Sequence, residues 1–288
     1  MSAQVGPLWE RGRRRLGEAG VPRARAEAGL LLGHLLGRSS AVLRARDEEP
    51  IEPAVAVAYE RLCERRAAGE PLAYLTGRRE FWSLDLRIAP GVLIPRPETE
   101  HLVEAALEVL GEGALRVADV GTGSGCVGLA LARERPDCLV IALDRAPHAL
   151  ALAAENARCL GLGARFRVVG SDGLSALRPD AGLDAIVSNP PYVPLRQWPE
   201  LMKDVRDHEP LGALSPGSDG LAATRRLVRD AAARLRPGGW LLFEIDPASA
   251  AEALRLPDPG AWEVPETRPD LEGRERVVRV RRGSRSAA

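Results

Sequence analysis

Apolar residues recur with two different periods along the chain, and the period changes near residue 70. In the first 70 residues, leucines stand at helical spacing, most densely at Leu30, Leu31, Leu32, Leu35 and Leu36. Glycine and proline interrupt this pattern near residues 20–22, 37–40 and 49–50. Because glycine and proline end helices, the pattern predicts a small bundle of helices for residues 1–70.

From about residue 96 onward, short apolar runs alternate with helical patterns, which is typical of a parallel sheet covered by helices. We expect strands near residues 115–120, 139–144, 165–170, 183–188 and 239–245. Two late segments, 261–267 and 276–281, could close the sheet. Between the two patterns, residues 72–94 hold shorter alternating runs, which predict a hairpin.

The pattern therefore predicts an α/β protein with an added helical domain. A chain of 288 residues is long enough for two domains. We expect a helical domain over residues 1–70, a linking β-hairpin over 71–95 and an α/β domain over 96–282. Residues 283–288 are expected to form a disordered tail.

Charge and cysteine content exclude several classes of protein. The net charge of +0 provides no global field for nonspecific nucleic-acid binding. The cysteines lack paired metal-ligand spacing, so no metal site is expected, and Cys126 and Cys138 are predicted to be buried reduced thiols. No apolar run has membrane-spanning length, and the basic N-terminus lacks the apolar core of a secretory signal. We therefore expect a cytoplasmic protein.

A glycine-rich turn follows the apolar run that begins at Val117, and residues 126–133 then have a helical pattern. Glycines let a ligand approach the backbone, and a helix N-terminus attracts anionic groups. Asp144 ends the next apolar run, at the spacing of an acid that binds ribose hydroxyls. The turn alone fits a nicotinamide cofactor and S-adenosylmethionine equally well, because Gly123, Gly125 and Gly128 also match G-x-G-x-x-G. A purely structural turn is the third alternative.

Asn189, Pro190, Pro191 and Tyr192 follow the expected strand 183–188 directly. In open α/β sheets, ligands bind at the carboxyl ends of strands. The two prolines stiffen the loop and remove backbone donors, while Asn189 adds an acceptor and Tyr192 a flat face. Such a loop suits a planar NH2 group, either an amide or the exocyclic amine of a base, and favours a methyltransferase over a dehydrogenase. The alternative is a structural turn that caps the sheet.

Further motifs carry a family resemblance. They are Pro71 to Gly77, Glu80-Phe81, Val92 to Glu100, Ser171-Asp172, Glu209-Pro210, Ala213-Leu214, Gly238-Gly239 and Arg274. Together with the glycine turn and Asn189 to Tyr192, they make the chain resemble the N5-glutamine methyltransferases that modify class-1 peptide chain release factors. The resemblance covers residues 70–280 strongly and the first 70 by helical character. Asn-Pro-Pro-Tyr is shared with DNA adenine methyltransferases, whereas the block that ends at Glu100 is more specific.

The resemblance implies a Rossmann-like class I sheet whose last strand runs antiparallel. It implies S-adenosylmethionine as cofactor, S-adenosylhomocysteine as product, and the glutamine of a Gly-Gly-Gln motif as methyl acceptor. The helical domain would dock the release factor, and the enzyme would act as a monomer without a stable nucleic-acid partner. The alternative is an adenine or cytosine amino-methyltransferase acting on a flipped base, which would need a basic channel and a recognition insert that the sequence does not show. A noncatalytic S-adenosylmethionine-binding module is a third possibility.

The resemblance also implies roles for single residues at the cofactor. The methionine end would lie against Gly121, Thr122, Gly123, Ser124 and Gly125. Asp119 would bind the cofactor's amino group or would order the loop, and Asp144 would bind both ribose hydroxyls or would cap the helix from Pro147. Asp172 would accept from the adenine amine with Gly173 and Leu174 beside the ring, although the family often has a larger residue at the position of Gly173.

At the methyl acceptor, Asn189 Oδ1 and the Pro190 carbonyl would accept both amide hydrogens, so that Asn189 serves cofactor and substrate together. Pro191 would complete the loop, and Tyr192 would pack on the amide plane. No general base is evident, so the proton would leave after methyl transfer.

Other motif residues have open roles. Arg96 and residues 98–100 would shape a cofactor lid or cap the following helix. Asp246 stands where the family usually has glycine, which leaves the local loop geometry open.

Overall fold

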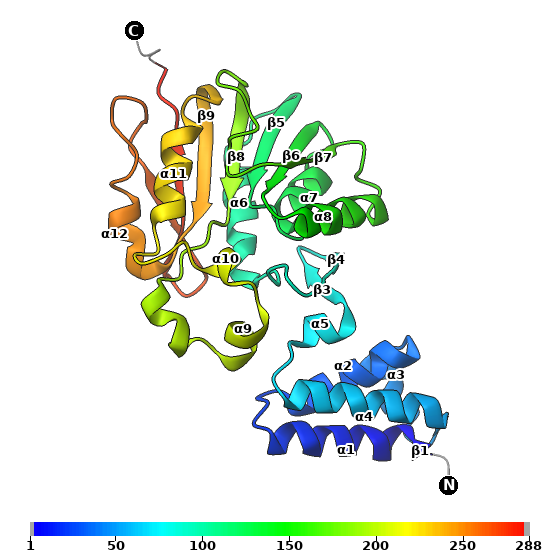
Figure 1. Cartoon of the computed structure of the whole chain (residues 1–288). Coiled ribbons are helices and arrows are strands. Elements are labelled where there is room, and N and C mark those ends of the chain that lie inside the picture. The colour runs from blue at the N-terminus through cyan, green and yellow to red at the C-terminus, as the bar shows by residue number, and fades with distance from the viewer. Residues whose placement is uncertain (1–2, 285–288) are drawn as a thin grey trace. The chain divides into compact units, whose positions relative to one another are not determined.

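The computed structural model describes residues 3–284 and divides them into two compact units (Figure 1). Of the described residues, one unit comprises 3–78 and 202–208, and the other comprises 79–201 and 209–284. The disordered tail is expected at residues 283–288, of which 285–288 lie outside the described residues.

The smaller unit is helical, as the leucine pattern predicts. Its elements are β1 (Ala3–Gln4), α1 (Val5–Glu18), α2 (Ala24–Leu36), α3 (Ser40–Arg44), β2 (Pro50–Ile51), α4 (Pro53–Ala67), α5 (Leu72–Thr76) and α9 (Lys203–His208). The breaks predicted near residues 20–22, 37–40 and 49–50 lie between α1 and α2, between α2 and α3, and between α3 and α4. Gly37 ends α2 in the left-handed conformation, and α4 begins at Pro53, just after the last predicted break. Tyr59 lies fully buried against α1, where a Cβ on Gly12 would come within 1.9 Å of its hydroxyl.

Helix α9 is distant in sequence from the rest of this unit. An arginine of α4, Arg66, is 8 % exposed and pairs through Nε with Glu27 Oε2 at 2.6 Å. Its Nη2 lies 3.8 Å from Asp204 Oδ2 of α9, and Lys203 Nζ donates to the Ala68 carbonyl at 3.2 Å. These contacts attach α9, which comes after Tyr192 in the sequence, to the other helices of this unit.

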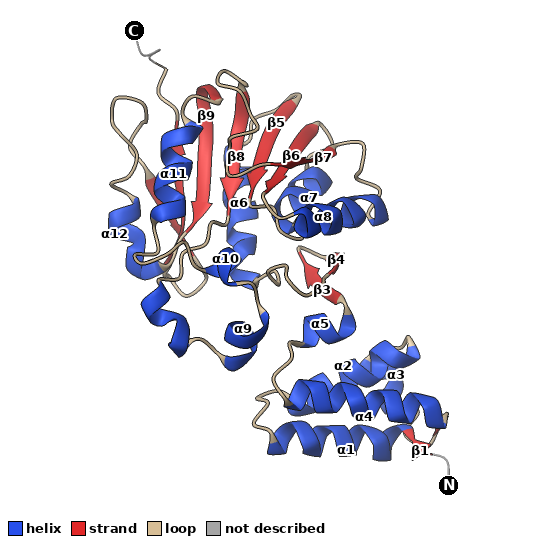
Figure 2. Cartoon of the chain, in the orientation of Figure 1, coloured by secondary structure: helices blue, strands red, loops and turns tan. Residues whose placement is uncertain are grey.

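The larger unit is built on a seven-stranded sheet (Figure 2). The strands follow one another in the order β10-β11-β9-β8-β5-β6-β7. Their bounds are β5 (Leu115–Val120), β6 (Cys138–Asp144), β7 (Phe166–Gly170), β8 (Leu183–Ser188), β9 (Leu235–Glu244), β10 (Glu266–Pro269) and β11 (Glu275–Arg281). Strand β11 runs antiparallel to both of its neighbours, which confirms the expected class I topology.

Helices cover both faces of this sheet (Figure 1). They are α6 (Glu100–Val109), α7 (Cys126–Glu134), α8 (Pro147–Cys159), α11 (Ala222–Ala231) and α12 (Ala250–Ala253). The unit also contains the short helix α10 (Leu211–Leu214) beside the cavity, and the 3-10 turns η1 (Pro97–Thr99), η2 (Leu195–Glu200) and η3 (Pro247–Ser249). Helix α11 lies in front of β9 in Figure 1, and α6 lies behind β8. The strands are therefore buried on both faces, which explains their continuous apolar runs.

The strand order places two loops side by side. The chain leaves β5 toward β6 and β7, then returns to form β8 on the other side of β5. Asp119 pairs in register with Val187, and Val120 with Ser188. The glycine turn after β5 and the loop after β8 therefore start at the same edge of the sheet, at the topological switch point where such folds bind ligands.

Two expected elements differ in detail. Residues 72–76 form helix α5, and the hairpin is the short pair β3 (Arg78–Phe81) and β4 (Leu84–Arg87). The strand expected at 261–267 begins at Glu266, because the Ala261 and Trp262 amides bond to Asp258 in a turn and Pro265 has no amide donor. Within residues 3–284, no helix combines the length and apolar character needed to cross a bilayer.

Candidate active site

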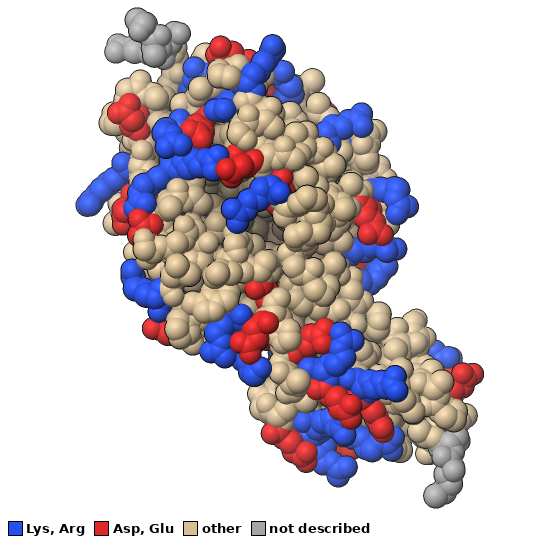
Figure 3. Space-filling model, in the orientation of Figure 1, with Lys and Arg blue, Asp and Glu red and all other residues tan. Residues whose placement is uncertain are grey.

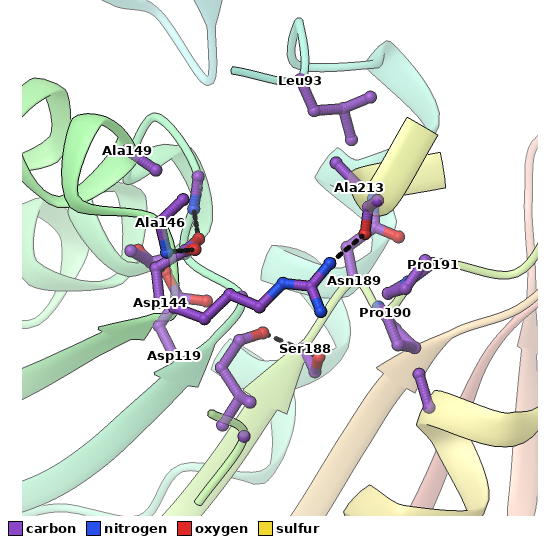
Figure 4. A pocket seen from close by; sticks show the side chains of 18 of the residues that line it. Leu93, Asp119, Asp144, Ala146, Ala149, Ser188, Asn189, Pro190, Pro191 and Ala213 are labelled. Carbon is purple, nitrogen blue, oxygen red and sulfur yellow. Dashed lines mark hydrogen bonds between the residues drawn. The ribbon is translucent and has the colours of Figure 1, made fainter. Parts of the chain in front are cut away.

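One cavity of about 620 Å³ opens at the carboxyl ends of β5, β6 and β8. In Figure 4, Asp119, Asp144 and Ala146 lie on one side of it and Asn189, Pro190 and Pro191 on the other. Figure 3 shows side chains of both charges around a hollow on this unit. The charged lining residues include Arg145, Arg226, Asp172 and Asp230. The volume lies in the range of small-molecule sites.

The glycine turn leaves the space on its side of the cavity open. Gly121, Gly123 and Gly125 have φ values of 72°, 55° and 86°, in the left-handed region that favours glycine. A Cβ on Gly125 would lie 2.9 Å from Leu129, whereas a Cβ on Gly121 would meet no atom within 4 Å. Gly125 therefore serves packing, and Gly121 borders free space where a ligand can approach the backbone.

Asp119 is 2 % exposed and lines the cavity. Its Oδ2 accepts from Thr122 Oγ1 at 2.6 Å and from the Gly128 amide at 3.0 Å. Burial raises the pKa of Asp119 to about 6, and these two donors oppose the rise. The loop-ordering contacts are thus present, and contact with a ligand amino group stays a prediction.

Asp144 connects the glycine turn to α8. Its Oδ2 accepts from the Gly123 amide at 3.0 Å, and its Oδ1 accepts from the Ala146 amide at 2.9 Å. Ala146 is the N-cap residue of α8, and Pro147 follows as its first residue. Each carboxylate oxygen retains a further acceptor site, so the helix contact and the predicted ribose contacts are compatible.

Asp172 borders the cavity on the β7 side and pairs with Arg226 of α11. Its Oδ2 accepts from Arg226 Nη1 at 2.6 Å, and its carbonyl accepts from Nη2 at 3.1 Å. The Asp172 side chain is 60 % exposed. Gly173 and Leu174 line the same part of the cavity, and the atom nearest to a Cβ on Gly173 belongs to Arg226 at 3.9 Å.

Asn189 stands opposite the glycine turn and donates through Nδ2 to Thr99 Oγ1 at 3.0 Å. Pro190 and Pro191 also line the cavity. Tyr192 is not among the described residues that line it, and its hydroxyl donates to Glu244 Oε1 at 3.1 Å. The packing of Tyr192 on a substrate amide therefore stays a prediction.

The block that ends at Glu100 contacts both Glu209 and Asn189. Arg96 Nη2 pairs with Glu209 Oε1 at 2.5 Å, and Glu209 Oε2 accepts from the Ile94 amide at 3.1 Å. Thr99 occupies the N-cap position of α6 without a side-chain cap, because its hydroxyl faces Asn189 instead. Arg96 and Thr99 both line the cavity. The side chain of Thr99 does not cap α6, the helix that follows.

Sequence reasoning assigned no role to Glu209 or Glu244. Glu209 is 6 % exposed and Glu244, at the end of β9, is 1 % exposed. The sequence does hold a signal for Glu244, because a carboxylate directly after the apolar run 240–243 indicates a buried acid at the end of a strand. Burial raises the pKa of Glu244, while the hydroxyls of Thr99 and Tyr192 and the charge of Arg276 lower it.

Asp246 caps a short turn. Its side chain accepts from the Ala248 amide at 2.9 Å, at the start of η3. Asp246 therefore begins the helical turn, as N-cap aspartates do.

Neither metal nor disulfide chemistry is visible in the part of the chain that the structure describes. Residues 3–284 contain no group of three histidine, cysteine or acidic side chains that could hold a metal ion. The four cysteines are free; Cys138 is buried as expected, whereas Cys126 is only partly buried because it lies beside the cavity.

Solved structures share the fold. A ribosomal protein L11 methylase from Lactobacillus delbrueckii subsp. bulgaricus superposes with a TM-score of 0.50 at 20% identity, over 69% of this chain and 85% of that chain. The hMettl16 catalytic domain, solved with an RNA hairpin, gives a TM-score of 0.56 at 17% identity over 85% of both chains. At these identities the likeness concerns the fold alone.

Two family models match the chain: the PrmC N-terminal domain over residues 8–77 and the methyltransferase small domain over residues 99–204. A release factor glutamine methyltransferase of Nitratidesulfovibrio vulgaris is 40% identical over 96% of this chain and 94% of the relative. Relatives with the same description from Moorella thermoacetica and Bordetella pertussis are 47% and 46% identical, each over 91% of this chain, with 93% and 96% of the relative covered. With such identity along nearly its whole length, this chain belongs to the family of release factor glutamine methyltransferases.

Proposed function

We propose that the protein transfers a methyl group from S-adenosylmethionine to the side-chain amide nitrogen of the glutamine in the Gly-Gly-Gln motif of class-1 peptide chain release factors, with S-adenosylhomocysteine as the second product. The observation that carries the proposal is the pairing of two loops at one cavity. The glycine turn after β5 and the Asn189 loop after β8 face each other there. Relatives described as release factor glutamine methyltransferases cover almost the whole chain.

The residues on the β5 and β6 side fit the cofactor. Gly121 leaves room for a ligand beside the backbone, and the carboxylate of Asp144 can accept from two hydroxyls while it holds Gly123 and Ala146. Asp119, ionised above a pKa of about 6, offers a negative charge to an amino group. S-adenosylmethionine, when bound, supplies an electrophilic methyl group on a positively charged sulfur.

The residues on the β8 side fit a glutamine amide. The nitrogen lone pair of an amide is delocalised into its carbonyl, so the nitrogen is a weak nucleophile. Asn189 Oδ1 and the Pro190 carbonyl provide two acceptors for its two hydrogens, at a loop stiffened by Pro190 and Pro191. These contacts would hold the nitrogen in a reactive orientation and favour the positive charge that builds on it.

The cavity lining does not offer an evident general base beside Asn189 within residues 3–284. The hydrogens of an amide nitrogen become strongly acidic once a fourth bond forms there. We therefore propose that the proton leaves after methyl transfer, to solvent.

We also propose that the helical unit docks the release factor, which is supported by the match of the PrmC N-terminal domain model to residues 8–77. Action on a translation factor supports the expected cytoplasmic location.

Transfer of a labelled methyl group tests the proposal. Purified enzyme would be incubated with labelled S-adenosylmethionine and one of three acceptors: an unmodified release factor, its variant with Gly-Gly-Ala in place of Gly-Gly-Gln, or duplex DNA. We expect label on the unmodified factor alone. Label on DNA would instead establish the base-amine alternative, and label on the Gly-Gly-Ala variant would place the methyl group on another residue.

A further inference from the structure

We propose that Arg96, held at the cavity by the buried carboxylate of Glu209, donates a hydrogen bond to the carbonyl oxygen of the substrate glutamine. Arg96 would then fix which end of the amide meets the methyl group, and Glu209 would be a positioning residue that acts through Arg96. The inference rests on the proposed function, because it completes the contacts that a side-chain amide needs at this site.

A glutamine side-chain amide carries two kinds of hydrogen-bonding group. Its NH2 has two hydrogens to donate, and its carbonyl oxygen accepts. The contacts proposed at the Asn189 loop, to Asn189 Oδ1 and to the Pro190 carbonyl, serve the NH2 alone. A carbonyl that leaves water for a closed site without a new donor loses binding free energy. We therefore looked for an N–H donor on the acceptor side of the cavity.

Arg96 lies on that side. Figure 4 shows Leu93, three positions before Arg96, on the same side of the cavity as Asn189. Thr99, three positions after Arg96, accepts from Asn189 Nδ2 at 3.0 Å. The chain thus carries Arg96 between two residues on the Asn189 side, and Arg96 itself lines the cavity. Its side chain is 30 % exposed, so a ligand in the cavity can reach it.

The cavity is lined by two further arginines among residues 3–284, Arg145 and Arg226. Arg226 pairs with Asp172 on the β7 side. Arg145 starts from the β6 side, and its Nη2 reaches the Gly212 carbonyl at 3.4 Å. Neither of them has a carboxylate that holds it on the acceptor side, so Arg96 is the better donor for the acceptor, and Arg145 is the rival that an experiment has to exclude.

Glu209 holds Arg96 in place. The side chain of Glu209 is 1 % exposed, and its Oε1 pairs with Arg96 Nη2 at 2.5 Å. Its Oε2 accepts from the Ile94 amide at 3.1 Å, which ties the carboxylate to the backbone two positions before Arg96. Bonds at both oxygens restrict the rotation of the carboxylate and thereby the position of the guanidinium. A guanidinium has five N–H groups, so the bond to Glu209 leaves donors for a ligand.

The charge of Glu209 matters as much as its hydrogen bonds. The sulfur of the cofactor is positively charged, and positive charge builds on the amide nitrogen as the methyl group moves. An unpaired guanidinium nearby would repel both charges, and at the carbonyl oxygen it would draw electrons away from the nitrogen. Glu209 offsets the charge of Arg96 and leaves its N–H groups available.

Arg96 and Asn189 together would define the direction of the substrate amide. In the productive direction, the NH2 meets Asn189 Oδ1 and the carbonyl oxygen meets Arg96. With the amide reversed, two acceptors would face each other at Asn189 and two donors at Arg96, and both hydrogen bonds would be lost. The nitrogen rather than the oxygen is then presented to the methyl group.

Cofactor binding gives a readout of the pair that requires no turnover. S-adenosylmethionine has a charged sulfur and S-adenosylhomocysteine a neutral one, so the ratio of the first Kd to the second reports the charge at the site. We expect Glu209→Gln to raise this ratio roughly fivefold and Arg96→Met to lower it by a similar factor. The double variant should return to the wild-type ratio, because both charges are then absent. Damage to the fold alone would weaken both ligands together.

Turnover tests the donor itself. We expect Arg96→Met to lower kcat/KM for the release factor roughly tenfold, and Arg96→Lys, which keeps a charged donor, to recover part of the loss. Arg145→Met, at saturating cofactor, should lower it much less. Asp184→Asn is the control for loss of an ion pair and should change neither quantity. Asp184 pairs with Arg236 at 2.6 Å near the start of β8, outside the cavity lining.

The outcomes separate this inference from the proposed function. If wild type methylates the release factor while Arg96→Met keeps the wild-type kcat/KM, or if Arg145→Met causes the larger loss, Arg96 is not the donor and the activity stands. An unchanged Kd ratio in Glu209→Gln would overturn the role of Glu209 as the partner that offsets charge. If wild type labels no release factor, the proposed function itself fails.

Discussion

The two sides of the cavity are built in different ways. On the β5 and β6 side, two carboxylates accept mainly from backbone amides 2 to 21 positions away. Asp119 accepts from the Gly128 amide and the Thr122 hydroxyl, and Asp144 accepts from the Ala146 and Gly123 amides. On the β8 side, side chains bind side chains from distant segments. Asn189 contacts Thr99, 90 positions earlier, and Tyr192 contacts Glu244, 52 positions later.

The two sides of the cavity differ in construction because, in the proposed function, they bind different groups. A turn of glycines and backbone donors can be completed by local sequence, and it suits a cofactor that many enzymes share. The side chain of Asn189 is held instead by Thr99, a partner that only the tertiary structure brings next to it. We therefore expect substitutions on the first side to change cofactor binding, and substitutions on the second side to change turnover.

The largest expected effect is on the acceptor side. Asn189→Ala removes one of the two acceptors for the substrate amide, and we expect kcat to fall about 10²- to 10³-fold, as for loss of a key transition-state contact. Because Asn189 is also expected to contact the cofactor, binding of S-adenosylmethionine, measured by calorimetry, should weaken, but much less than kcat falls. Equal losses in kcat and in cofactor affinity would show that the two sides do not act separately.

The next effect concerns Asp144 and the cofactor. Asp144→Ala removes the predicted acceptor of two ribose hydroxyls and the contacts to Gly123 and Ala146, so the Kd for S-adenosylmethionine should rise roughly ten- to a hundredfold. Asp137→Ala is the control, because Asp137 forms an ion pair with Arg135 away from the cavity. A normal Kd combined with a low kcat in Asp144→Ala would contradict the division between the sides.

The pH dependence of cofactor binding sharpens the role of Asp119. Burial raises its pKa to about 6, so the carboxyl is ionised above that pH and neutral below it. If Asp119 attracts the cofactor's amino group, the Kd should rise as pH falls below 6, by at most about tenfold per pH unit. Titration calorimetry between pH 5 and pH 8, at roughly unit intervals, would measure it. The same slope in Asp119→Asn would exclude Asp119 as its cause.

The smallest effect is expected at the exposed pair of Arg226 and Asp172. Arg226→Ala frees the Asp172 carboxylate for the predicted adenine contact but removes a surface ion pair worth about 0.2–1 kcal/mol. We expect KM for S-adenosylmethionine to change by less than about fivefold. Arg225→Ala, on the same helix but outside the lining, is the matched control. A change of a hundredfold would mean that Arg226 itself holds the cofactor.

The same contrast explains what the sequence could predict. The strands from β5 to β9 and the glycine turn follow from local period and composition, since buried parallel strands are continuous apolar runs. Glu244 lies in the strand expected at residues 239–245, and Thr99 lies in the segment expected to form a lid or cap a helix. The contacts of Thr99 with Asn189 and of Glu244 with Tyr192 depend on strand order and register. No local pattern encodes that.

In the helical unit, too, local patterns predicted the elements but not the contacts between distant segments. Its helices are separated where glycine and proline predicted, near residues 20–22, 37–40 and 49–50. The addition of α9 to this unit was missed, because it rests on contacts of Arg66 and Ala68 with residues more than 130 positions away. Charged side chains at such separations leave no periodic signal.

The position of the transferred methyl group tests the central claim most directly. Release factor treated with wild-type enzyme and isotopically heavy S-adenosylmethionine would be digested, and the peptide that contains Gly-Gly-Gln would be fragmented in a mass spectrometer. We expect one heavy methyl group on the side-chain nitrogen of that glutamine, and almost none after the same treatment with Asn189→Ala. A methyl group on a different residue, or an equal yield with Asn189→Ala, would contradict it.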